Sequence, residues 1–174
     1  MKLTPSELTV LGLLIEQPRH GYDLERVIEQ RGVREWTDIG FSSIYYLLSK
    51  LEKRGLVEAG EAAGAAKSRR VFHATTAGKK AATHTARALV EEFLPVAHPL
   101  LVGIANLPLL TEQSYRTALR SRFDQVEARI AEVRETQRAQ QSLPMAAREV
   151  FSYSLSLLEA ERSWLAERVR VDDD

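Results

Sequence analysis

Apolar residues recur at helical spacing in three short segments within the first 55 residues. The first segment follows Thr4-Pro5-Ser6-Glu7, a capping box with proline at the first helical position, and ends at Gln17-Pro18. The second lies between residues 21 and 32, where a glycine stops it. The third lies between residues 42 and 55. Its apolar positions follow the i, i+3, i+4, i+7 pattern of a one-sided helix, namely Ile44, Leu47, Leu48 and Leu51. Three closely linked short helices predict a tri-helical domain.

A β-hairpin is expected after the third helix. Residues 56–59 are short and extended, residues 71–74 are their expected partner, and the stretch between them is punctuated by glycine and basic at its far end. Thr75 or Thr76 then caps a further helix. Three helices followed by a hairpin is the order of a winged helix-turn-helix.

The second half of the chain is predicted to be helical. Prolines 95, 99 and 108 interrupt residues 94–110, which are therefore expected to be kinked or split. Two long amphipathic helices follow, joined by a turn at Ser142-Leu143-Pro144, and the first has a coiled-coil-like seam with steps of three and four residues. The expected fold is mainly α: a winged helix-turn-helix domain over residues 1–80 and a helical dimerisation domain over residues 81–174.

The two long helices offer too little partner surface to bury both of their apolar seams, which predicts a homodimer. The alternative is a monomer in which these helices fold back onto the winged domain. The residues expected at the dimer interface are apolar and at helical spacing: Leu119, Phe123, Val126, Ile130, Val150, Leu157, Leu158, Trp164 and Leu165.

Charge changes this picture only locally. The chain has 24 basic and 24 acidic residues, but residues 42–80 carry eight basic and three acidic side chains, a local charge of +5. Such an excess indicates a surface for a polyanion, although a solvated surface stretch explains it as well.

Several classes of function are excluded by composition and motif. The absence of cysteine excludes disulfides, thiolate metal sites and a cysteine nucleophile. The histidines show no metal-ligand spacing, and neither a Gly-x-Ser-x-Gly elbow nor a glycine-rich phosphate loop occurs. No run approaches the roughly 20 apolar residues of a membrane helix, and the N-terminus does not resemble a signal peptide. We therefore expect a cytoplasmic protein that is not an enzyme, has no cofactor or metal and does not enter membranes.

Four short motifs, in order, resemble the PadR family of transcriptional regulators. They are His20-Gly21-Tyr22, Ser43-Ile44-Tyr45, residues 51–57 (LEKRGLV), and Arg69-Arg70-Val71-Phe72 before Thr75-Thr76-Ala77-Gly78. The helical remainder resembles the two-helix dimerisation region of the PadR branch related to virulence activators. The resemblance implies a dimeric winged helix-turn-helix repressor that binds a palindromic operator on double-stranded DNA.

If the third helix lies in the major groove, its apolar stripe faces the core and its polar side chains face the DNA. These side chains are Ser42, Ser43, Tyr45, Tyr46, Ser49 and Lys50. For Tyr45, a place at the rim of the core is the alternative. Lys53 and Arg54 also face outward, but a favourable interaction with the helix dipole explains them equally well.

The hairpin tip contributes further candidates for DNA contact, because a tip has little structural need for three cations: Lys67, Ser68, Arg69 and Arg70. At the start of the second helix, the resemblance suggests phosphate contacts by His20 and Tyr22. Capping and packing are the alternative for this pair.

PadR-like proteins commonly respond to small aromatic or lipophilic molecules, so the resemblance also implies a small-molecule effector. Trp36, Tyr153 and Trp164 are candidates to line a pocket between the winged domain and the dimer helices. Plain core or interface packing is the alternative for all three.

Two other functions remain open at this point. A winged-helix scaffold for protein contacts, without specific DNA binding, is favoured by the zero net charge. An enzyme or ligand-sequestering protein would instead use an apolar pocket between helices.

Overall fold

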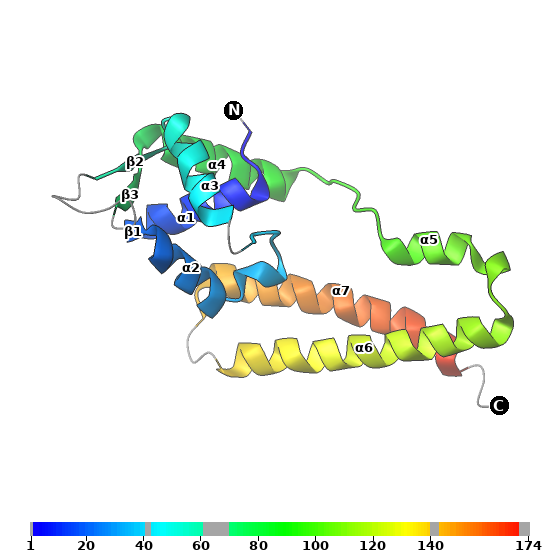
Figure 1. Ribbon diagram of the computed structural model, residues 1–174. Helices are drawn as coiled ribbons and strands as arrows, with labels where there is room; N and C mark the ends of the chain where they lie inside the picture. The colour runs from blue at the N-terminus through cyan, green and yellow to red at the C-terminus, as the bar shows by residue number, and fades with distance from the viewer. Residues whose placement is uncertain (1, 41–42, 61–69, 140–142, 171–174) are drawn as a thin grey trace. The chain divides into compact units, whose positions relative to one another are not determined.

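The computed structural model describes residues 2–40, 43–60, 70–139 and 143–170 (Figure 1). The chain separates into two compact units, Met1–Pro95 and Val96–Asp174. The division falls after Pro95, whereas the sequence placed it after residue 80. The difference arises because the helix that follows the hairpin packs onto the first unit, as described below.

The first unit contains three helices, a small sheet and a fourth helix. In chain order its elements are α1 (Pro5–Glu16), β1 (Arg19–His20), α2 (Gly21–Gln30), a 3₁₀ turn η1 (Val33–Glu35), α3 (Ser43–Lys53), β2 (Val57–Ala59), β3 (Val71–Ala74) and α4 (Thr76–Glu91). This confirms the expected winged helix-turn-helix order.

The sheet has three strands in the order β1-β3-β2, and both pairings are antiparallel. Phe72 on the central strand β3 lies opposite Arg19 on one side and Ala59 on the other. Strand β1 was not expected from the sequence. It ties the start of α2 to the base of the hairpin.

Local interactions fix where α1 and α3 begin and end. The side chain of Thr4 accepts a hydrogen bond from the Glu7 amide, and the Glu7 carboxylate accepts one from the Thr4 amide, which completes the expected capping box. At the end of α3, Gly55 adopts a φ of 66°. The amide of Leu56 then donates to the carbonyl of Leu51 at 3.0 Å, as in a Schellman C-cap. Strand β2 begins directly after this turn.

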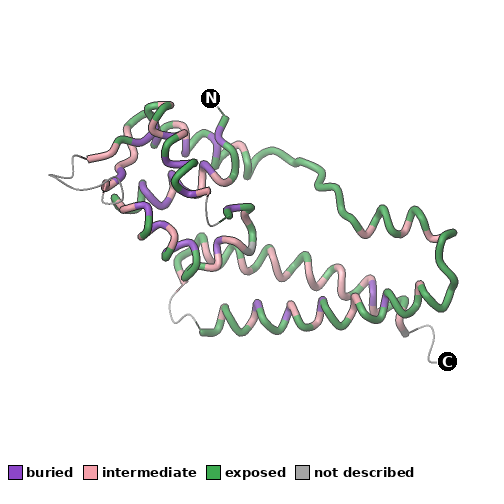
Figure 2. Tube along the Cα trace, in the orientation of Figure 1, coloured by how far each residue is buried: buried purple, intermediate pink, exposed green. Residues whose placement is uncertain are grey.

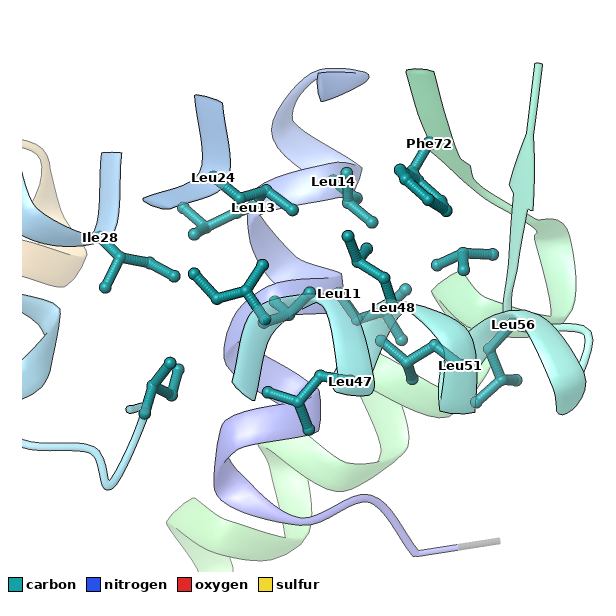
Figure 3. Close-up of a cluster of buried hydrophobic side chains, with 14 of the residues drawn as sticks. Leu11, Leu13, Leu14, Leu24, Ile28, Leu47, Leu48, Leu51, Leu56 and Phe72 are labelled. Atoms are coloured by element: carbon teal, nitrogen blue, oxygen red, sulfur yellow. The ribbon is translucent and has the colours of Figure 1, made fainter. Parts of the chain in front are cut away.

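The core of the first unit lies between α1, α2, α3 and the sheet (Figures 2 and 3). Leu11, Leu24, Ile44 and Leu51 are fully buried, so each of the three N-terminal helices contributes its apolar stripe. Burial of such side chains contributes about 1.5–3 kcal/mol each.

Helix α4 joins this core through small residues. Ala82 is buried, and a Cβ added to Gly78 would lie 2.1 Å from the carbonyl oxygen of Leu56. Thr75 caps α4 by accepting from the Gly78 amide, and its hydroxyl donates to the Gly55 carbonyl at 2.8 Å. Helix α4 therefore starts in direct contact with the turn after α3 and belongs to the first unit.

The second unit consists of α5 (Pro99–Ala105), a 3₁₀ turn η3 (Leu107–Leu109), and two long helices, α6 (Glu112–Ala139) and α7 (Met145–Arg170). The prolines thus split residues 94–110, as expected. Helices α6 and α7 run side by side in opposite directions (Figure 1). Ion pairs also join them, from Arg122 to Glu161 at 2.5 Å and from Arg134 to Glu159 at 2.7 Å.

Much of the predicted dimer seam is used inside this helical hairpin. Among the nine residues expected at the interface, four are buried within the α6–α7 hairpin, namely Leu119, Val126, Ile130 and Leu165. Three more pack partly buried against them: Phe123, Leu158 and Trp164. Only Val150 and Leu157 are exposed, at 40% and 56%. The antiparallel helices bury most of the seam against each other, which leaves a smaller apolar face on α7 than the sequence suggested.

None of the helices in the described ranges is long and apolar enough to span a lipid bilayer.

Candidate nucleic-acid interface

Helix α3 has one buried face and one exposed polar face. Ile44, Leu47, Leu48 and Leu51 are buried in the core, whereas Tyr45 and Tyr46 are 51% and 66% exposed. Ser49, one turn beyond Tyr45, is also exposed. Hydroxyl groups thus dominate the first part of this outer face. Ser43 begins the helix, and its hydroxyl donates to the Gly40 carbonyl at 2.6 Å. Ser42 lies outside the described residues.

Tyr45 lies against the start of α2. A Cβ added to the buried Gly21 would come within 2.6 Å of Cε1 of the Tyr45 ring, so only glycine fits beneath the ring as it stands. The ring is therefore supported by α2 on one side while half of the residue remains exposed. Tyr45 thus packs against α2 and is also half exposed, so its exposure is compatible with a contact to a partner.

His20 and Tyr22 form a stacked pair at the N-terminus of α2. Their ring centroids are 5.3 Å apart with an interplanar angle of 9°. His20 occupies the N-cap position but makes no capping hydrogen bond; its Nδ1 lies 3.3 Å from the carbonyl oxygen of Arg70. Tyr22 is 56% exposed. The pair thus connects α2 to the base of the hairpin and presents an exposed phenol.

The basic residues of the hairpin are described only at its base. Arg70 pairs with Glu52 of α3 at 2.5 Å, and its guanidinium lies 5.5 Å from the centre of the Phe72 ring. Lys67, Ser68 and Arg69, all proposed from the sequence, lie outside the described residues.

Lys50 of α3 and Arg54, the residue that follows α3, both bind one buried carboxylate. Lys50 Nζ and Arg54 Nη1 each lie 2.9 Å from Oε1 of Glu7, which is 1% exposed. Burial opposes ionisation of Glu7, but hydrogen bonds from the Thr4 amide, Lys50 and Arg54, with the charge of Arg54, together lower its pKa to about 2. The sequence did not reveal this contact, because the capping box already explained Glu7.

These ion pairs reduce the number of unpaired cations in residues 42–80. Among the cations of residues 42–80, Lys50, Arg54 and Arg70 are paired with carboxylates. By contrast, Lys79 and Lys80 in the first turns of α4 are exposed and make no ion pair with another described residue. Lys53, the last residue of α3, is likewise exposed and makes no ion pair with another described residue, so the unpaired positive charge of these described residues lies at the end of α3 and the start of α4 rather than at the centre of α3.

The candidate effector residues lie in different surroundings. Trp36 and Tyr153 are 53% and 69% exposed. Trp164 packs against the α6–α7 core, with the Arg168 guanidinium 3.9 Å from its ring centre. A cavity of about 670 Å³ lies between α6 and α7, but it is lined mainly by polar residues and includes none of these three aromatics. The described residues contain no cluster of three or more side chains able to hold a metal ion.

Comparison with known proteins identifies the first unit. Residues 10–84 match the family model described as the transcriptional regulator PadR-like family. The resemblance noted from the four sequence motifs is thereby confirmed over the winged helix-turn-helix, and the class is that of transcriptional regulators rather than enzymes. Over residues 10–84, the N-terminal unit is therefore similar to PadR-like regulators.

Solved structures share the fold over nearly the whole chain. Bacillus subtilis PadR in complex with operator DNA is 17% identical, with a TM-score of 0.77, and the match covers 97% of this chain and 99% of that one. The same protein in complex with p-coumaric acid is 16% identical, with a TM-score of 0.77 and coverage of 97% and 98%. The Vibrio cholerae virulence activator AphA is 16% identical, with a TM-score of 0.72 and coverage of 94% and 95%. A search of curated protein sequences finds no significant match.

Proposed function

We propose that this protein is a homodimeric repressor that binds a palindromic operator through α3 and the β2–β3 hairpin. The observation that carries the proposal is the division of α3 into a buried apolar stripe and an exposed face with Tyr45, Tyr46 and Ser49. A helix whose outer face bears hydroxyl groups can place them against base edges and phosphates of the major groove. The match to a family of transcriptional regulators supports this function.

The winged unit supplies two further contacts to the phosphate backbone. The hairpin sequence carries Lys67 and Arg69 next to Arg70, which pairs with Glu52, and the stacked His20 and Tyr22 present an exposed phenol beside the hairpin base. Phosphate contacts fix the orientation of a reading helix on the duplex without specifying sequence. A regulator with this partner acts where chromosomal DNA is accessible, and the proposed location is the cytoplasm.

Homodimerisation is supported by apolar side chains that neither unit buries. In the second unit, the large apolar residues that are at least 40% exposed are Val96, Leu101, Val102, Leu109, Leu110, Met145, Val150, Tyr153 and Leu157. Exposed apolar surface of this kind is typical of sites where a protein binds a partner. A two-fold dimer would cover it and would present two α3 helices to two half-sites.

Release by a small aromatic or lipophilic molecule completes the proposal. It rests on the structural likeness to a protein solved with p-coumaric acid and on the exposed Trp36 and Tyr153. Titration of small aromatic acids, followed by tryptophan fluorescence with and without operator duplex, tests this step. Binding that lowers operator affinity supports an effector. Tight binding without any effect on DNA would instead support a ligand-sequestering protein.

The DNA-binding surface is tested with the double variant Lys67→Ala/Arg69→Ala, which leaves the Arg70–Glu52 ion pair intact. Its affinity is measured by fluorescence anisotropy on duplexes tiled across the upstream region of its own gene, at several salt concentrations. We expect weaker binding and a shallower salt dependence, because each lost phosphate contact removes about 0.9 from the slope of log K against log salt. Arg87→Ala/Arg129→Ala removes the same charge from α4 and α6 and serves as the control. Unchanged operator binding by the hairpin variant would contradict the role of the wing, and no selective binding by the unmodified protein would favour the protein-interaction scaffold.

A further inference from the structure

Glu7 is the most deeply buried charged residue among those the structure describes. It lies in the first turn of α1, and both of its carboxylate oxygens are engaged. Oε2 accepts a hydrogen bond from the Thr4 amide at 2.8 Å, whereas Oε1 contacts Lys50 Nζ and Arg54 Nη1 at 2.9 Å each. One carboxylate thus caps α1 and binds two cations, Lys50 in α3 and Arg54 directly after it.

Capping alone does not explain this arrangement. A glutamine closes a capping box as a glutamate does, so the cap itself does not require a negative charge. A buried carboxylate, however, is costly unless cations compensate its charge. Arg54 follows Lys50 by four residues, and its amide donates to the Lys50 carbonyl at 3.2 Å, so both side chains extend from the same side of the C-terminal end of α3 toward α1. Arg54 also donates to the Lys2 carbonyl at 3.3 Å, which adds a second contact to the segment before α1.

These ion pairs change the charge that α3, the proposed DNA-reading helix, offers to a partner. Lys50 follows Tyr46 by one helical turn, where a free lysine would be within reach of the DNA phosphates. Because the pKa of Glu7 is about 2, the carboxylate is fully ionised near neutral pH and holds Lys50 and Arg54 throughout. The outer face of α3 then offers hydroxyl groups rather than free cations at its centre.

We propose that Glu7 is a specificity-determining positioning residue: it holds Lys50 and Arg54 away from the DNA backbone, so that α3 reads bases with uncharged side chains. This inference rests on the proposed DNA-binding function. Cations contribute sequence-independent affinity, so their retention by Glu7 raises the ratio of specific to non-specific binding.

The experiment compares the salt dependence of binding to operator and to random duplex for the full-length protein and three variants. Glu7→Gln keeps the capping box but releases both cations. We expect its salt slope to steepen by about 0.9 for each released cation that reaches a phosphate, with random duplex gaining more affinity than operator. Glu16→Gln removes the same charge from α1, from a glutamate that pairs with Arg31. We expect it to change neither the salt slope nor the relative affinity for operator and random duplex. Lys50→Met is expected to leave the slope unchanged, because this lysine is held by Glu7.

An unchanged slope in folded Glu7→Gln would overturn the inference, and so would a slope about 0.9 shallower in Lys50→Met. Lys50→Met tests the inference even if Glu7→Gln does not fold. The ionic contact is also measured without DNA, by ¹³C NMR titration of the glutamate carboxyls: Glu7 should titrate near pH 2, and titration near pH 4.5 would overturn the inference. Failure of the unmodified protein to bind any duplex would contradict the proposed function instead, so the two failures are distinguishable.

Discussion

The Glu7 carboxylate should make the stability of the first unit depend on pH in a defined range. Its pKa falls from 4.5 to about 2 on folding, a shift caused by the hydrogen bonds and charge that outweigh burial. Because the pKa is lowered in the folded state, the ionised group stabilises the fold above pH 4.5. That contribution is lost as pH falls through about 2.

The size of the effect follows from this shift. A shift of about 2.5 pKa units corresponds to about 3 kcal/mol, at about 1.4 kcal/mol per unit. Since Lys50 is 42% exposed, solvent screens its part of the interaction, and about 3 kcal/mol is an upper limit. Glu7→Gln keeps the cap and removes the charge, so we expect it to be less stable than the unmodified protein by about 1–3 kcal/mol at pH 7.

Urea unfolding followed by circular dichroism, at pH values from 7 down to 2.5, measures this effect. The two stability curves should differ most at pH 7 and approach one another below pH 4.5, while other acidic groups titrate in both proteins. Glu16→Gln, whose side chain is 49% exposed, should follow the unmodified protein throughout. Parallel curves for Glu7→Gln and the unmodified protein would refute the assignment of a strongly lowered pKa to Glu7.

Three glycines give further predictions. Gly78→Ala places a Cβ 2.1 Å from the Leu56 carbonyl oxygen, so we expect urea unfolding to show a loss of about 1–3 kcal/mol. Gly12, in the interior of α1, has no atom near an added Cβ, and Gly12→Ala should stabilise by about 0.5–1 kcal/mol; equal stabilities for the two variants would contradict the close contact at Gly78. Gly21→Ala pushes against the Tyr45 ring, which is the movable end of a side chain, so anisotropy should show weaker operator binding with little loss of stability. Unchanged operator affinity in a folded Gly21→Ala would indicate that the placement of Tyr45 is unimportant.

Local patterns in the sequence were sufficient to predict most helices and strands of the first unit. The capping box at Thr4, the apolar stripe of α3 and the glycine at residue 55 each depend on neighbours within a few residues, and the structure contains all three. The exposed face of α3 follows from the same stripe. Strand β1 was missed because two residues cannot show an alternating pattern, and only its pairing with β3 makes it a strand.

The remaining differences between the sequence-based predictions and the structure depend on contacts between segments that are distant in the chain. Glu7 and Arg54 are 47 residues apart, so the sequence could not show that one carboxylate would neutralise cations that had been counted as available. Likewise, an apolar seam such as Leu119, Val126 and Ile130 does not specify whether its partner is the next helix or a second chain. Here α7 covers it. Spacing identifies an apolar face, but tertiary packing determines what covers that face.

The central claim is tested most directly by the anisotropy and stoichiometry of the unmodified protein on duplexes tiled across its upstream region, with each half-site also tested alone. We predict selective binding to one palindromic duplex by two chains, with a steep salt dependence and much weaker binding to a single half-site. Weak, salt-insensitive binding to every duplex would contradict a DNA-binding regulator and would favour a winged-helix scaffold for protein contacts.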